Sequence, residues 1–417
     1  MEAVRQTPSQ AMVVLGLGRK NMIRFTRRQT LAGLAGLAAL PATAAFAQGL
    51  KLPTSPVALN IIDVAGNLAL TQKAMEAYAA ANPKLVSAIT FNKATAPELP
   101  GKIAAEQAAG RLDIDMVLSG TDALAAGIAQ NLWIKLVPDH ADALPDLDSI
   151  YLDAAKNMQA LSQGYGVTVT YYPSGPLIEY MPDQVAEADV PKTAQALLDW
   201  AKANPNKFIY ARPANSGPGR TFMMGLPYIL GDKDPMDPEN GWDKTWAYLQ
   251  ELGKYIEYYT TGTGALMKEL GEGTRAMTVT TTGWDINPRV LGTVPEEAKV
   301  GKIEGFHWVA DAHYMIVPKG VSDDKLAVLL DLMKYMLTPA AQAYTYDEGY
   351  FYPGPAVKDV PITMAPQESQ DAIKQFGRAE YADWIANNPI EVPLDPLTMV
   401  KAFDLWDKKI GGAQIKK

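Results

Sequence analysis

The chain has 417 residues, enough for two or three domains, so a single small module is excluded. With 48% hydrophobic, 20% charged and 9% aromatic residues it can bury a sizeable core, which excludes global disorder. A formal net charge of −8, without any block of Lys and Arg, argues against a nucleic-acid or anionic-membrane surface. The absence of cysteine excludes disulfides, thiolate metal sites and thiol nucleophiles.

The N-terminus has the pattern of an export signal. Arg27 and Arg28 precede a short apolar run over 32–40, and Ala-Phe-Ala at 45–47 is a small-residue cleavage site. The run is too short to span a bilayer, which needs about 20 apolar residues. The paired arginines resemble the twin-arginine signal, with an ordinary secretory signal as the alternative. We therefore expect residues 1–47 to be cleaved.

The expected mature chain begins at Gln48. Cleavage after Ala47 removes six basic residues and one acidic residue, so the net charge changes from −8 to −13. Met22 stands at the usual distance before such a signal, and residues 1–21 are then an upstream extension. No second apolar stretch approaches membrane-spanning length. These features predict a soluble protein of the periplasm.

Helical and strand patterns alternate along the mature chain, which is typical of α/β proteins. The first unit is a buried-strand run over 57–64, a turn over 65–67 and a helical repeat that ends at Asn82-Pro83. The remaining predicted strands lie at 114–118, 165–172, 208–211, 277–281 and 307–318, and the predicted helices at 196–201, 222–230, 242–256, 325–337 and, with proline breaks, over the tail from 361 to 417.

The order of elements and three short motifs resemble the extracellular solute-binding proteins that feed ABC importers. The motifs are Gly-Arg-Leu-Asp-Ile-Asp-Met-Val-Leu at 110–118, Gly-Tyr-Gly-Val-Thr-Val-Thr-Tyr-Tyr at 164–172 and Met-Ile-Val-Pro-Lys-Gly at 315–320. The branch it resembles includes polyamine, ferric-ion, thiamine and phosphonate binders. The resemblance implies a two-lobed α/β periplasmic-binding-protein fold, type II-like, whose lobes are joined by crossing strands. Lobe one would hold 57–165 and 312–417 with the C-terminal helices, and lobe two 170–308.

The same resemblance implies a function. The protein would be a monomeric receptor that closes its lobes around one small polar organic solute, without chemical change, and delivers it to an inner-membrane ABC permease. It implies no cofactor and no resident metal. Adjacent tyrosines at 171–172 and 258–259 resemble ferric-ion binders, but neighbours on a strand point to opposite faces, so neither pair alone forms a chelate.

Candidate ligand residues lie where predicted strands end, because ligands of open α/β sheets gather at the carboxyl ends of the strands. In lobe one these are the loops at 65–67, 95–98 and 119–122, which contribute Asn67, Thr121 and Asp122. Asn, Thr and Asp also cap helices for structural reasons alone, and this alternative stays open.

In lobe two the loop over 213–221 favours an anion. Ser216, Gly217 and Gly219 would present N–H groups at a helix N-terminus, and Arg220 would add a bidentate donor, which suits a carboxylate, phosphonate or phosphate. We expect Arg220→Ala to weaken binding by roughly 1.5–3 kcal/mol with little effect on stability, as for a surface arginine. The alternative is a capped loop with Arg220 on a solvated face.

Aromatic and acidic residues favour a cation instead. Polyamine binders of this branch place a Trp and an Asp at a strand end, as Trp284 and Asp285 do here, though with different spacing. Tyr350 and Tyr352 belong to a dense aromatic segment that suits either a binding cleft or interlobe packing. Together with Arg220 these residues permit a zwitterion.

An enzyme is the alternative from another class. Asp311, with His313 two residues later, and Asp285 could serve as paired carboxylates of a secreted lyase or hydrolase. The chain has only three histidines, however, and lacks a nucleophile motif. We therefore name Asp311 as a ligand-binding candidate and expect no catalysis.

Overall fold

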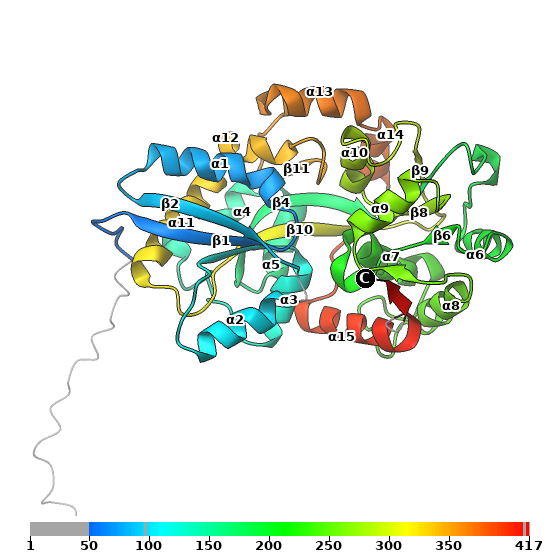
Figure 1. Cartoon of the computed structure of the whole chain (residues 1–417), viewed down its shortest axis with the longest axis horizontal. Coiled ribbons are helices and arrows are strands. Elements are labelled where there is room, and N and C mark those ends of the chain that lie inside the picture. Colours follow the sequence, from blue (N-terminus) through cyan, green and yellow to red (C-terminus); the bar gives the residue numbers. More distant parts are fainter. Residues whose placement is uncertain (1–49, 96–97, 412–413, 417) are drawn as a thin grey trace, which may run out of the picture. The chain divides into compact units, whose positions relative to one another are not determined.

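The computed structural model describes residues 50–95, 98–411 and 414–416, so the expected export signal lies outside the described residues. These residues form two main sheets, and each sheet has its own hydrophobic core. Figure 1 shows the two sheets with their flanking helices. Within the described residues, no helix is both long and apolar enough to cross a membrane.

The first sheet combines a parallel half with an antiparallel half. Its strands lie in the order β11, β4, β10, β3, β1, β2, and a short β12 pairs with β10. Strands β1, β2 and β3 run parallel, so their carboxyl ends meet at one edge of the sheet. The strands are β1 (Val57–Asp63), β2 (Val86–Lys93), β3 (Met116–Ser119), β4 (Gly166–Gly175), β10 (Trp308–Ile316), β11 (Gly354–Pro355) and β12 (Ile390–Glu391).

Helices cover both faces of this sheet. In Figure 1, α1 lies above β1 and β2, and α2 lies below them. The apolar faces of the helices close a core that includes Met75, Leu124 and Met333. The helices are α1 (Leu68–Ala81), α2 (Leu99–Ala108), α3 (Thr121–Ala129), α4 (Leu147–Ile150), α5 (Asp153–Leu161), α11 (Asp323–Met336) and α12 (Pro339–Gln342).

The second sheet is smaller and has the order β6, β8, β5, β9. Its core includes Leu197, Phe222 and Leu249, from three helices that pack on the sheet. The strands are β5 (Leu177–Tyr180), β6 (Phe208–Ile209), β8 (Met277–Thr280) and β9 (Lys299–Gly301), and the helices are α6 (Ala194–Ala203), α7 (Gly217–Leu230), α8 (Asp243–Gly253), α9 (Thr263–Gly271) and α10 (Thr282–Val290).

Two long strands join the sheets. Strand β4 leads through Pro176 directly into β5, and β10 returns from the second sheet to the first. The two strands pair along most of their length, with Val309 opposite Gly175 and Ile316 opposite Gly166. Every residue of both strands is buried. The chain therefore crosses from the first sheet to the second at 175–177 and returns to the first at Trp308.

The C-terminal tail packs differently from our expectation that residues 312–417 belong to lobe one. Met399 and Trp406 are buried in the second core, and Ile415 of β13 (Ile415–Lys416) pairs with Tyr259 of β7 (Tyr259–Thr260). The tail helices are α13 (Gln367–Phe376), α14 (Glu380–Asn387) and α15 (Pro396–Trp406). Helix α15 also packs against α3 of the first sheet. The tail therefore joins the second sheet, because the apolar face of α15 completes the core there.

Candidate functional site

A polar cavity of about 300 Å³ lies where the two sheets meet. One wall consists of the residues that follow β1, β2 and β3, and the other of the N-terminal ends of α7, α9 and α10. The two crossing strands contribute its floor. The lining residues are Val64, Ala65, Ala94, Thr95, Gly120, Asp122, Tyr172, Asn215, Ser216, Gly217, Arg220, Gly262, Thr263, Gly264, Trp284, Asp311, His313, Tyr350 and Phe351.

Arg220 occupies the centre of the cavity wall, between two carboxylates. Its side chain donates a hydrogen bond to Asp311 on β10, and its Nη1 lies 3.3 Å from Oδ2 of Asp122 on α3. Only 4% of Arg220 is exposed. The expectation that it behaves as a surface arginine is therefore wrong, and so is the alternative that it lies on a solvated face. Arg220 is buried because the apolar helix α7 brings it against both the crossing strand and the first sheet.

Asp311 is held by further donors. The Tyr172 hydroxyl donates to its Oδ2 at 3.0 Å, and the Thr121 hydroxyl donates to its Oδ1 at 2.8 Å. Thr121 is absent from the cavity lining, so the structure gives it a supporting contact with Asp311 in place of the predicted direct contact with ligand. A buried carboxylate with this many partners is fixed in position.

Burial and neighbouring charges set the ionisation of the cavity. Burial would raise the pKa of Asp311, but Arg220 and the hydrogen bonds outweigh it and lower that pKa. Burial raises the pKa of Asp122, although Arg220 opposes the shift. Burial lowers the pKa of His313 to about 4, so this imidazole is neutral at pH 7. The cavity therefore holds one guanidinium beside two acidic side chains, and of these Asp311 is the one whose ionised form is favoured.

His313 is oriented by a residue that the sequence named as a ligand. The Nδ2 of Asn67 lies 2.9 Å from Nδ1 of His313, and the Thr71 hydroxyl donates to Oδ1 of Asn67 at 2.8 Å. The amide of Asn67 is therefore the donor to His313, and the imidazole carries its proton on Nε2. Asn67 is fully buried behind the cavity and does not line it.

At the N-terminal end of α7, the N-cap residue Ser216 accepts a hydrogen bond from one of the free backbone N–H groups of the helix. The hydroxyl of Ser216 accepts a hydrogen bond from the N–H of Gly219 at 3.1 Å and lies 2.8 Å from the Thr263 hydroxyl. Gly219 does not line the cavity, and its N–H is occupied, so the predicted anion contact at Gly219 finds no support. Ser216 and Gly217 do line the cavity, beside Thr263 at the start of α9.

Aromatic rings from two distant segments close one side of the cavity. Trp284 and Tyr350 contact edge to face, with ring centroids 5.3 Å apart. Their approach depends on Gly283, where an added Cβ would lie 1.9 Å from the carbonyl oxygen of Tyr350. Tyr352 lies outside the lining, and its carbonyl accepts a hydrogen bond from Thr282 at 2.7 Å. The aromatic segment therefore both lines the cavity and anchors α10.

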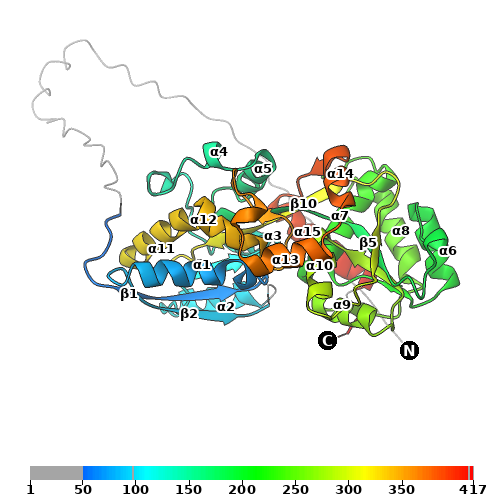
Figure 2. The same ribbon diagram turned by 90° about the horizontal axis from the view of Figure 1, so that it is seen from above.

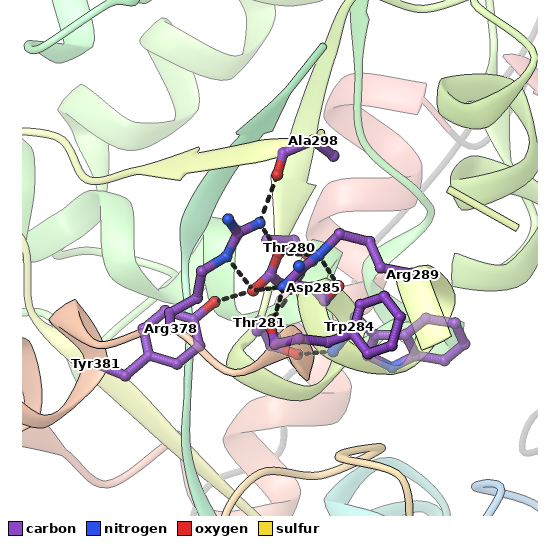
Figure 3. Close-up of polar contacts among 9 residues, drawn as sticks. Thr280, Thr281, Trp284, Asp285, Arg289, Ala298, Arg378 and Tyr381 are labelled. Atoms are coloured by element: carbon purple, nitrogen blue, oxygen red, sulfur yellow. Dashed lines mark hydrogen bonds and ion pairs between the residues drawn. The ribbon is translucent and has the colours of Figure 1, made fainter. Parts of the chain in front are cut away.

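Asp285 points away from the cavity into a buried ion-pair cluster (Figure 3). Its carboxylate accepts hydrogen bonds from Arg289, from Arg378 and, at 2.6 Å, from the Tyr381 hydroxyl. Arg378 also donates to the Ala298 carbonyl at 2.6 Å. The structure thus gives Asp285 a structural role in fixing the tail to α10, and it does not bring Asp285 and Asp311 together as a carboxylate pair.

Sequence reasoning missed several lining residues and undervalued His313. The missed helix is α9, which has no strong apolar pattern in the sequence; the lining residues at its start are Gly262, Thr263 and Gly264. Phe351 also lines the cavity and lies between Tyr350 and Tyr352, but it was not named as a ligand candidate. A Gly-Thr-Gly run ahead of an apolar helix is the signal that would have found them. In the described part of the chain, no group of three or more His, Asp or Glu side chains is placed to hold a metal ion.

Comparisons with known proteins agree with this architecture. Residues 73–374 match the family described as bacterial extracellular solute-binding protein. The fold is similar to a putative spermidine/putrescine ABC transporter structure from Listeria monocytogenes (16% identity, 83% of this chain, 96% of that chain, TM-score 0.58). It is also similar to an apo ferric ion-binding protein A from Pasteurella haemolytica (14%, 84%, 97%, 0.56) and to a periplasmic thiamin binding protein (13%, 87%, 99%, 0.58). No curated protein sequence matches the chain.

Proposed function

The chain belongs to the bacterial extracellular solute-binding proteins, and we propose that its solute is a small zwitterion held in the polar cavity. It is the solute-binding protein of an ABC transporter and has the α/β two-sheet periplasmic-binding-protein fold that its sequence resembles. The family is non-enzymatic, which decides against a secreted lyase or hydrolase.

The charge arrangement of the polar cavity carries the proposal. Arg220 is already paired with Asp311, so its charge is not free for an anion, and Asp122 is a second acidic group beside it. Gly217 and Thr263 lie at the N-terminal ends of α7 and α9, where helix dipoles and unpaired N–H groups favour a carboxylate. A solute with an ammonium group toward Asp122 and an acid group toward these helices matches both features. A polyamine-like cation would use only the first.

Closure of the two sheets on the solute is part of the same proposal. The wall with Asp122 comes from the first sheet and the wall with Gly217 and Thr263 from the second. A solute that contacts both walls stabilises the closed arrangement by its differential affinity for it. We propose that a membrane permease of the inner membrane recognises that state and receives the solute.

Replacing Asp122 by asparagine tests the zwitterion. The solute is first identified by mass spectrometry of the natively purified protein, and its affinity is then measured by titration calorimetry. Loss of a charge-assisted hydrogen bond should raise Kd by tenfold or more, which corresponds to about 1.5–3 kcal/mol. Stability should change little, because Arg220 keeps Asp311 as its partner.

The matched control is Asp113→Asn, which removes a largely exposed carboxylate outside the cavity. That variant should bind like the natural protein. An Asp122→Asn variant that binds more tightly would identify the solute as an anion, because the substitution would then have removed a repulsion. Unchanged affinity would place the ammonium group elsewhere and contradict the proposal.

The location in the periplasm is proposed from the export signal, which lies outside the described residues. Replacing Arg27 and Arg28 by lysine should leave unprocessed precursor in the cytoplasm if the twin-arginine route is used. Immunoblotting of periplasmic and cytoplasmic fractions measures this. Normal periplasmic accumulation of the variant would refute the route and leave ordinary secretion as the explanation.

A further inference from the structure

A second cavity, of about 580 Å³, lies next to the polar cavity and has a different chemical character. Its lining includes the apolar side chains of Leu68 and Ala69 on α1, Met267 on α9, and Pro288 and Leu291 at the end of α10. Helix α1 covers the first sheet, whereas α9 and α10 belong to the second. This apolar cavity therefore also lies where the two sheets meet. Charged and amide groups, among them Lys93 and Glu348, complete the lining.

The two cavities share three residues, Gly264, Trp284 and Tyr350. The edge-to-face pair of Trp284 and Tyr350 therefore stands at their common boundary. Gly66 helps to place that boundary, since an added Cβ there would lie 2.2 Å from the Tyr350 hydroxyl. Flat rings at such a boundary offer a stacking face to a chain that passes between the cavities.

Size and exposure indicate what the apolar cavity takes. The polar cavity is at the lower end of the usual range for ligand sites, about 300–1,000 Å³, and accommodates only a small charged head. Leu291 is 63% exposed, more than any other large apolar side chain that the structure describes, and it lines a cavity that the buried Met267 also lines. Single exposed leucines are common, but one that lines a concave apolar site is positioned to contact a ligand.

We propose that the apolar cavity is a second subsite, which takes an apolar group of the solute whose charged head lies in the polar cavity. The solute is then an amphiphilic zwitterion, such as an amino acid with a ring or a branched chain at the end of its side chain. This inference rests on the proposed function for the position of the head. The inference adds that an apolar part of the solute extends past Trp284 and Tyr350 into the apolar cavity.

A pair of amino acids that differ only by a phenyl group tests the subsite. L-2-Aminobutanoate and L-homophenylalanine carry the same head, and calorimetry measures the Kd of each. Homophenylalanine should bind at least tenfold more tightly. Leu291→Gln should abolish this difference and leave the Kd of 2-aminobutanoate unchanged. Leu397→Gln is the matched control, because Leu397 is also an exposed leucine (51%) but lies on α15, outside both cavities.

Each other outcome is also decisive. Equal affinity of the two amino acids, or a preference that survives Leu291→Gln, overturns the subsite while the head assignment stands. If neither amino acid binds, the zwitterion head is wrong, and the uncharged fluorophore N-phenyl-1-naphthylamine tests the apolar cavity separately. Saturable emission that is lost in Leu291→Gln but retained in Leu397→Gln supports the subsite. Emission that is absent, or equal in both variants, overturns it.

Discussion

Replacing Arg220 by alanine is expected to lower the free energy of unfolding by about 3–5 kcal/mol, the cost of breaking a buried ion pair from one side. The substitution leaves the buried Asp311 and the partly buried Asp122 without their common cation. Arg220 opposes the burial that raises the pKa of both groups, so its loss should raise both pKa values further. Urea unfolding of the ligand-free protein measures the change. The sequence had predicted almost no loss of stability.

The control is Arg111→Ala, which removes an arginine whose side chain is 80% exposed beside Asp113. Its unfolding midpoint should be nearly unchanged, because exposed ion pairs contribute little. A second variant, Asp311→Ala in the Arg220→Ala background, should cost much less than Asp311→Ala alone, since the pair is already broken. If Arg220→Ala unfolds at the natural midpoint, the buried contact with Asp311 does not hold this region together.

The strands that build the centre of the fold were predictable because they are buried on both faces. Strands β4 and β10 are of this kind: every residue of each is buried, and their sequences are mostly apolar and aromatic residues and threonine. The carboxyl-end rule then identified the loops after β1 and β3 as cavity walls. The position of the strands depends on local sequence, which explains why it could be predicted, and residues of both loops line the cavity.

Two of the elements that sequence reasoning missed, β5 and α10, are short or carry conflicting local signals. Strand β5 is four residues long and holds a buried Glu179 in its middle, which lowers its apolar content. Helix α10 starts with Thr282 and Gly283 and contains Pro288, so its sequence resembles the end of a strand. It forms nevertheless because Thr281 caps it and because the tail packs against it.

Partners in the site could not be predicted, because they are distant in the sequence. Arg220 and Asp311 are 91 residues apart, and Asn67 and His313 are 246 residues apart. No local pattern specifies that a side chain at one strand end will meet another across a crossing strand. The sequence therefore named Asn67 and Asp285 as ligand groups, whereas folding turns each of them toward a protein partner.

The cluster around Asp285 should be the second large contribution to stability. Asp285→Ala removes the carboxylate that Arg289, Arg378 and the Tyr381 hydroxyl share, and leaves the buried guanidinium of Arg289 and the partly buried one of Arg378 without it (Figure 3). The expected loss in free energy of unfolding is about 3–5 kcal/mol. Urea unfolding measures it, with Lys73→Ala as a control that breaks an exposed ion pair. A loss no larger than in this control would contradict the role of the cluster.

The protonation state of Glu179 should affect how much stability the Asp285→Ala variant loses. Burial first, and then the neighbouring carboxylate of Asp285, raise the pKa of Glu179 well above its ordinary value, which favours its neutral form beside the cluster. Removal of Asp285 takes away the repulsion and leaves Arg289 and Arg378, both of which lower that pKa. Glu179 should then ionise and replace part of the lost charge.

A double-mutant cycle decides whether this happens. Glu179→Gln alone should change the free energy of unfolding by less than about 1 kcal/mol, because a neutral acid is replaced by a neutral amide of the same shape. The same substitution in the Asp285→Ala background should cost at least about 1 kcal/mol more than it does alone, since two guanidinium groups then have no carboxylate at all. Additive losses would mean that Glu179 stays protonated in the variant. In that case Glu179 does not replace the carboxylate of Asp285 as a partner of Arg289 and Arg378.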